Sequence, residues 1–198
     1  MYTNFFKNIS HKKSGFTVLE TLFALVIFSI SLVTLMTIAG RGLSATTSSY
    51  ELLVANYLNQ ESIEAVRYVR DSNFITTPSV SWLAGLDICT RSAPPAPCEI
   101  VFPKTLRVPT IVNCPSGRCS SLYEENGSYD TIPSSGNARM TSYVRSIIIE
   151  PITPTPTGPV PIGTVLPPTE AVVTSTITWN SKGINRQVSH QTILHKWR

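Results

Sequence analysis

A single apolar stretch near the N-terminus constrains this chain more than any other feature. Residues 16–40 contain one charged side chain, Glu20, and neither glycine nor proline before Gly40. The stretch is longer than the roughly 20 residues that a helix needs to cross the hydrocarbon core of a bilayer. A core helix of a soluble protein is the alternative, but such helices are usually shorter and amphipathic. We therefore predict a transmembrane helix over residues 16–40.

Nearly all of the basic charge lies ahead of this stretch. The 198 residues carry a formal net charge of +4, and residues 1–15 contain Lys7, Lys12 and Lys13 but no acid. The net charge of +1 that is left for the rest of the chain does not support nucleic-acid binding. Positive residues that flank a membrane span tend to stay in the cytoplasm. We therefore expect a cytoplasmic leader over residues 1–15, one pass through a membrane, and an exported remainder.

The helical pattern continues beyond the apolar stretch. Residues 50–71 contain neither glycine nor proline, and a stripe of apolar side chains recurs at spacings of about three and four: Val54, Leu58, Ala65, Val66 and Val69. Gly40 and Gly42 weaken the helix and predict a bend or local melting near the membrane exit. We expect residues 41–72 to form an amphipathic extension of the helix, with an apolar face that needs a cover.

The cover is predicted to be a small antiparallel sheet within an exported head, residues 73–198. Residues 73–142 are expected to be rich in loops. Residues 143–150, 171–179 and 186–194 are β-branched and partly alternating, which indicates strands, and Asn180-Ser181-Lys182-Gly183 indicates a hairpin turn. A proline-rich insert over residues 151–168 is expected to stay outside the sheet. The predicted fold class is α+β.

Four cysteines, Cys89, Cys98, Cys114 and Cys119, fall in the part of the chain that we expect to be exported. Their spacings differ from the close C-x2-C pairs of zinc sites, and prolines and glycines surround them. Two disulfides are therefore expected rather than a metal site. Short loop closure favours the pairs 89–98 and 114–119, although four cysteines allow three connectivities.

No set of residues suggests catalysis. His190 and His195 are expected to be solvated surface side chains, and Glu124, Glu125 and Asp130 a solvated acidic loop rather than a calcium site. No phosphate-binding loop, dinucleotide fingerprint or hydrolase motif is present. We expect no cofactor and no enzymatic activity.

Residues 12–20 (KKSGFTVLE), with the apolar run that follows, resemble the class III signal of type IV prepilins and type II secretion pseudopilins. The resemblance implies that a prepilin peptidase, which is also an N-methyltransferase, cuts after Gly15 and methylates the new N-terminus, Phe16. Glu20 would be the fifth mature residue and would pair with the amino group of a neighbouring subunit. An ordinary secretory signal fits less well, because its apolar core is only 7–15 residues long.

Residues 41–71 are similar to minor pilins of the PilV and pseudopilin-I kinds. The resemblance implies a minor pilin or pseudopilin that assembles with other such subunits, through its N-terminal helix, into a type IV pilus or a secretion or competence pseudopilus. Two alternatives stay open. The head could be a tip adhesin or a DNA-uptake module, or the span could anchor an enzyme.

Overall fold

The computed structural model describes residue 15 and residues 17–76, 81–90, 96–103, 108–133, 135–154 and 167–196. Residues 1–14 of the leader, Phe16 and most of the proline-rich insert therefore lie outside the described residues. The chain divides into two units, residues 1–47 and residues 48–198, which are taken separately below.

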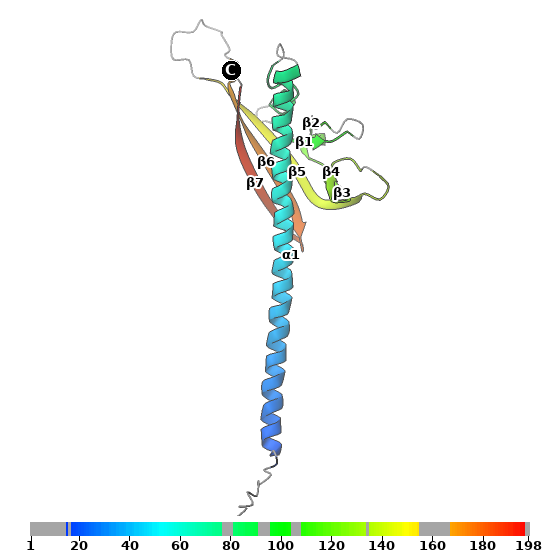
Figure 1. The fold of residues 1–198 in the computed structure, drawn as a ribbon, viewed down its shortest axis with the longest axis vertical. Helices are drawn as coiled ribbons and strands as arrows, with labels where there is room; N and C mark the ends of the chain where they lie inside the picture. Colours follow the sequence, from blue (N-terminus) through cyan, green and yellow to red (C-terminus); the bar gives the residue numbers. More distant parts are fainter. Residues whose placement is uncertain are drawn as a thin grey trace, which may run out of the picture. The chain divides into compact units, whose positions relative to one another are not determined.

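Helix α1 runs without interruption from Val18 to Thr76 (Figure 1). The local melting expected at Gly40 and Gly42 is absent, because both glycines are helical. An isolated glycine costs a helix only about 1 kcal/mol relative to alanine, which a long helix tolerates. Helix α1 also ends four residues later than the predicted end at residue 72.

In the first unit, the large apolar side chains of α1 from Val18 to Ile38 are 46–79% exposed. The hydroxyl groups among them do not need water, because each donates a hydrogen bond of 2.7–2.9 Å to the carbonyl oxygen four residues earlier: Ser29, Ser31, Thr34 and Thr37. This part of α1 is long and apolar enough to cross a membrane. It fits membrane anchoring, since a surface of this kind is stable only in lipid or against other apolar helices.

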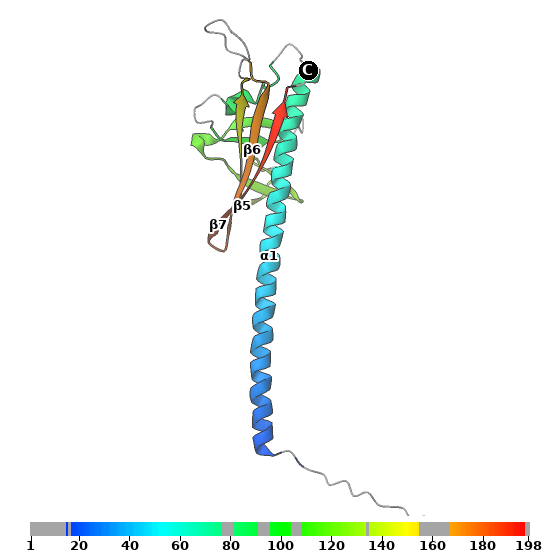
Figure 2. The same ribbon diagram turned by 90° about the vertical axis from the view of Figure 1, so that its left-hand side faces the viewer.

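The described residues of the second unit form a seven-stranded antiparallel sheet. Figures 1 and 2 show its three long strands side by side, β5 (Arg139–Ile152), β6 (Glu170–Ser181) and β7 (Ile184–His195). Strand β5 pairs with β6 on one side and with β3 and β1 on the other. The short strands are β1 (Cys98–Val101), β2 (Thr110–Asn113), β3 (Ser121–Glu125) and β4 (Ser128–Asp130).

Two predictions for the head are wrong in detail. The four short strands and two 3-10 turns, Asp87–Cys89 and Pro115–Gly117, occupy the segment that we expected to be loop-rich. Strand β5 also includes Pro151, which pairs with Ala171 and which we had placed in an insert outside the sheet. Only β6 pairs with β5 at this position among the described strands, so a residue without an N–H is tolerated there.

The hairpin turn between β6 and β7 was predicted correctly. Lys182 and Gly183 form a two-residue loop with φ values of +52° and +83°, the left-handed pair that a type I′ turn requires. Asn180 Oδ1 accepts a hydrogen bond of 2.9 Å from the Gly183 N–H and holds the turn closed.

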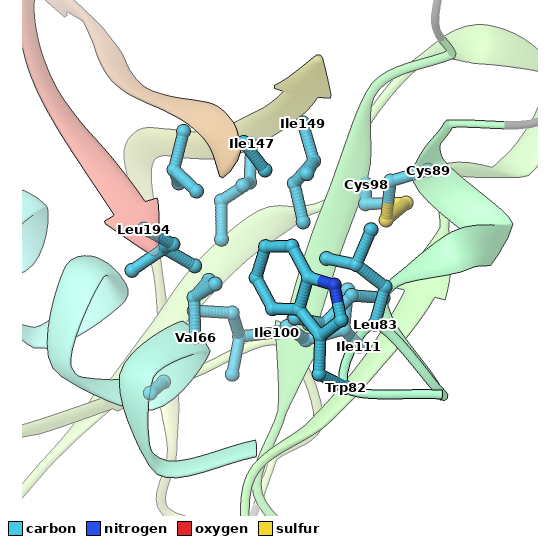
Figure 3. Packing of buried hydrophobic residues seen from close by; sticks show 14 residues of the cluster. Val66, Trp82, Leu83, Cys89, Cys98, Ile100, Ile111, Ile147, Ile149 and Leu194 are labelled. Atoms are coloured by element: carbon cyan, nitrogen blue, oxygen red, sulfur yellow. A yellow bond between two sulfur atoms is a disulfide. The ribbon is translucent and has the colours of Figure 1, made fainter. Parts of the chain in front are cut away.

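Helix α1 and the sheet enclose the core of the second unit. The predicted apolar stripe is buried at Val54, Leu58, Ala65 and Val66, and Val69 packs beside it. The larger of two clusters contains Trp82, Ile100 and the Cys89–Cys98 disulfide (Figure 3). Asn59 Nδ2 donates a hydrogen bond of 3.1 Å to the Val188 carbonyl, so the helix also covers part of the outer edge of β7. The architecture is α+β, as predicted.

Candidate functional site

Residues of the N-terminal motif cap the start of α1. Thr17 precedes the first helical residue, and its Oγ1 accepts a hydrogen bond of 3.3 Å from the Glu20 N–H, while its carbonyl oxygen accepts one of 3.2 Å from the Thr21 N–H. A threonine followed three residues later by a glutamate is the pattern of a helix-capping box. The Glu20 carboxylate also lies in the first turn, where the helix dipole favours a negative charge.

Glu20 is exposed and forms no ion pair within the described part of the chain. Its neighbours on the helix surface are the exposed apolar side chains of residues 18–38. A carboxylate in such a setting costs roughly 2.5–3.5 kcal/mol at the centre of a membrane, and less near the interface, unless a cation neutralises it. The start of α1 therefore presents an exposed carboxylate among exposed apolar side chains.

Gly15 is also exposed, and a Cβ placed on it would meet no atom within 4 Å. The packing of the described residues therefore does not demand a glycine at this position. Phe16, the predicted site of N-methylation, lies outside the described residues, so the structure does not place its side chain beside Gly15 or Glu20.

In the head, an ion pair joins α1 to the sheet. Arg145 Nη1 on β5 lies 2.8 Å from Glu61 Oε2 on α1, and the Arg145 side chain is fully buried whereas that of Glu61 is 42% exposed. Arg145 Nη2 donates to the Ile100 carbonyl at 3.3 Å, and the guanidinium carbon lies 5.7 Å from the centre of the Phe102 ring. Burial lowers the pKa of Arg145, and the Glu61 carboxylate opposes that shift. One cation thus links α1, β1 and β5.

A second contact between α1 and the sheet is aromatic. Glu51 Oε2 accepts a hydrogen bond of 3.2 Å from Trp179 Nε1, and the Glu51 carbonyl accepts one of 3.2 Å from the Tyr143 hydroxyl. Burial, followed by the charge of Glu51, raises the pKa of Tyr143 to about 12. Beside this contact lies a groove of about 940 Å³, into which Tyr50 and Tyr57 of α1 also face.

The four cysteines form two disulfides, Cys89–Cys98 and Cys114–Cys119. The sulfurs of Cys114 and Cys119 lie close to the carboxylate of Glu99, the one group of three ligand-type side chains near enough to share an ion in the described part of the chain. Both sulfurs are already used in the disulfide. Glu99 in turn accepts hydrogen bonds from the Ser120 N–H at 2.7 Å and from its hydroxyl at 3.3 Å, so its carboxylate has partners in the protein.

His190 and His195 both lie on β7. His195 is exposed and its Nδ1 lies 3.1 Å from Glu170 Oε1 across the β6–β7 pair. His190 is half-buried in a hollow beside Glu64 and Arg67 of α1. These two α1 residues pair with each other at 2.6 Å.

The Glu61–Arg145 pair was not foreseen from the sequence, although a signal for it exists. Along β5, Tyr143, Arg145, Ile147 and Ile149 alternate with more exposed residues, so all four point to the buried face. A lone arginine at an inward position of a strand requires a buried acceptor. The sequence does not say which acid supplies it, because Glu61 is 84 residues away in the chain.

Comparison with known proteins agrees with the geometry at the start of α1. Residues 10–36 match the family described as the prokaryotic N-terminal methylation motif. No curated protein and no solved structure gave a significant match. The match supports a type IV pilin-like class III signal at the N-terminus and does not extend into the head. The fold, a long N-terminal apolar helix with an antiparallel sheet, is consistent with that of type IV pilins.

Proposed function

We propose that this chain is a minor pilin or pseudopilin, a structural subunit rather than an enzyme. A prepilin peptidase cuts it between Gly15 and Phe16 and methylates the Phe16 amine, and the mature subunit assembles through α1 into a type IV pilus or a secretion or competence pseudopilus. The observation that carries the proposal is the methylation motif over residues 10–36, which overlaps an apolar helix with a carboxylate in its first turn.

The subunit passes once through the inner membrane before assembly, with the leader in the cytoplasm and the head outside. The lysines ahead of the apolar stretch support this orientation. The two disulfides support it as well, because disulfides persist in oxidising compartments.

Glu20 sets the position of each subunit against its neighbour. Its carboxylate pairs with the Phe16 amine of an adjacent subunit, and the pair neutralises two charges that would otherwise lie among apolar helices. Support comes from the exposure of Glu20 and from its lack of an ion pair within the described residues. Removing one partner of a buried pair is strongly unfavourable, so the contact discriminates against other registers.

Processing is tested by mass spectrometry after co-expression with a prepilin peptidase. The expected product begins at N-methylated Phe16. Gly15→Val is a suitable variant, because a Cβ at this position meets no atom within 4 Å. We expect it to block cleavage, and a mature N-terminus at any residue other than Phe16 contradicts the proposal.

The register role is tested separately by Glu20→Gln. We expect the variant to be cleaved like the natural sequence but to enter filaments poorly, as measured by immunoblots of sheared filaments. Glu64→Gln, which removes an exposed carboxylate elsewhere on α1, is the matched control and should assemble normally. Normal assembly of Glu20→Gln would reject the register role.

A second candidate function is a binding head at the filament tip. The groove beside Tyr50 and Tyr57 favours it, since both side chains are 63% exposed and exposed aromatic residues often mark binding surfaces. DNA is a poorly supported ligand because the chain after residue 15 has a net charge of only +1. Salt-dependent retention of the full chain on immobilised DNA would favour DNA uptake.

A further inference from the structure

The turn between β3 and β4 carries three consecutive exposed residues, Asn126, Gly127 and Ser128. Glu125 pairs with Ser128 at the ends of the two strands, so Asn126 and Gly127 form a two-residue loop. Their φ values of +53° and +79° fit a type I′ turn, in which Asn-Gly is a preferred pair. The turn geometry therefore accounts for Asn126 and Gly127, but it requires no particular side chain at Ser128.

The side chains of Asn126 and Ser128 have no hydrogen-bond partner within the described part of the chain. The neighbouring Glu124 is bonded, because its Oε1 accepts from the Gly127 N–H at 3.1 Å. A Cβ placed on Gly127 would meet no atom within 4 Å, so no other described segment crowds the turn. An amide and a hydroxyl two residues apart are therefore both open to solvent.

Asn126-Gly127-Ser128 is an N-x-S sequence, the acceptor pattern for N-linked glycosylation of secreted chains. The pattern is short, and it occurs once more in the chain, at Asn8-Ile9-Ser10. That second instance lies in the leader, which the proposed function places in the cytoplasm and removes. The exposure of Asn126 and its place in the head distinguish it as the acceptor.

We propose that Asn126 is N-glycosylated once the head has been exported. The inference rests on the outward orientation of the proposed function. The sugar donor is an oligosaccharide attached to a polyprenyl diphosphate. Asn126 Nδ2 attacks the anomeric carbon, a C–N bond forms as the C–O bond to the diphosphate breaks, the lipid diphosphate leaves, and the amide gives up one proton. The transferase binds the Ser128 hydroxyl to place the amide, and Glu124 adds a charge that favours this site.

A glycan at this turn would also shield an edge of the sheet. Within the described residues, β4 pairs with β3 alone, which leaves its other edge without a neighbouring strand. An open edge of this kind invites strand addition from other chains. A bulky and strongly hydrated glycan beside the first residue of β4 hinders that pairing.

Glycopeptide mass spectrometry tests the proposal on the full chain, isolated from the membranes of the cells that make it. Trypsin cuts after Arg118 and Arg139 and releases residues 119–139, which include Asn126. We expect this peptide to carry the glycan, and fragmentation to place it on Asn126. Asn137 lies in the same peptide without a hydroxyl two residues later, so it is the internal reference and should be unmodified.

Two substitutions of Ser128 form a matched pair, because both keep Asn126, Gly127 and the backbone pairing of β4. We expect Ser128→Ala to abolish the modification and Ser128→Thr to retain it. Asn126→Asp should abolish it as well, since Asp-Gly preserves the turn. Mapping both disulfides in every variant checks that the head has folded in an oxidising compartment.

Four results overturn the proposal. A natural chain that has both disulfides but no glycan overturns this inference alone and leaves the pilin function intact. A glycan that persists in Asn126→Asp is attached elsewhere, and one that persists in Ser128→Ala does not depend on the N-x-S pattern. A glycan on Asn8 overturns the outward orientation of the head together with this inference.

Discussion

The buried ion pair between Arg145 and Glu61 gives the sharpest test of how the head is held together. Glu61→Gln removes the charge that neutralises Arg145 but keeps an amide oxygen at the same place. Breaking a fully buried pair costs about 3–5 kcal/mol. Because the Glu61 side chain is 42% exposed and the amide still accepts a hydrogen bond, we expect a loss of about 2 kcal/mol.

A second substitution separates the energy of the Glu61–Arg145 interaction from other effects of Glu61→Gln. Arg145→Met removes the buried cation and leaves Glu61 partly solvated. In that background Glu61→Gln should cost less than about 0.5 kcal/mol, because no buried charge is left to neutralise. The control Glu64→Gln breaks an exposed pair, whose side chains are 42% and 66% exposed, and should also cost less than about 0.5 kcal/mol.

The measurement is urea unfolding of the full chain in detergent micelles, followed by tryptophan fluorescence. Trp82 and Trp179 are 8% and 4% exposed, so their emission reports on the core of the head. Linear extrapolation gives the free energy of unfolding for each member of the cycle. An equal cost of Glu61→Gln with and without Arg145 would refute the reasoning, since the carboxylate would then act independently of the buried cation.

Two further predictions concern pH and the disulfides. The folded-state pKa of Tyr143, about 12, lies above the value of 10.0 for a free tyrosine, so its contribution to stability is complete below pH 10 and is lost as the pH rises through 12. Unfolding measured from pH 9 to 12 should therefore show the natural chain losing up to about 2 kcal/mol more than Tyr143→Phe, and parallel curves would contradict this assignment. Replacing Cys89 and Cys98 together by alanine should lower the free energy of unfolding by about 3 kcal/mol, because that disulfide closes the longer loop and lies in the main core. Replacing Cys114 and Cys119 should cost about 2 kcal/mol, and the reverse order of the two would show that burial and loop length do not govern these bonds.

The sequence predicts the parts of the fold that long, regular patterns specify. The apolar stretch and the stripe on residues 50–71 extend over many helical turns, and the structure confirms them as one helix. The β6–β7 hairpin was equally clear, because strands of β-branched residues flank a turn that ends in Gly183. Patterns of this length outweigh local exceptions such as the glycines at 40 and 42.

The short strands were missed for a physical reason. Strands β1 to β4 have three to five residues each, too few to establish an alternation, and turn-forming residues and cysteines interrupt the sequence around them. Strands β1 and β3 are held by pairing with β5, which is distant in the chain, and they in turn pair with β2 and β4. The Glu61–Arg145 pair depends on the same long-range packing. At the N-terminal site, the sequence motif identified Gly15, Phe16 and Glu20. The hydrogen bond by which Thr17 caps α1 was found only in the structure.

The order of the disulfides has a consequence for how the head is made. Each cysteine bonds to the next one along the chain, the first to the second and the third to the fourth. A head that emerges across a membrane from its N-terminal side presents its thiols in that same order. An oxidase that joins each new thiol to the one before it then produces the native connectivity directly. With the orientation proposed above, this order of pairing requires no exchange of wrongly paired cysteines.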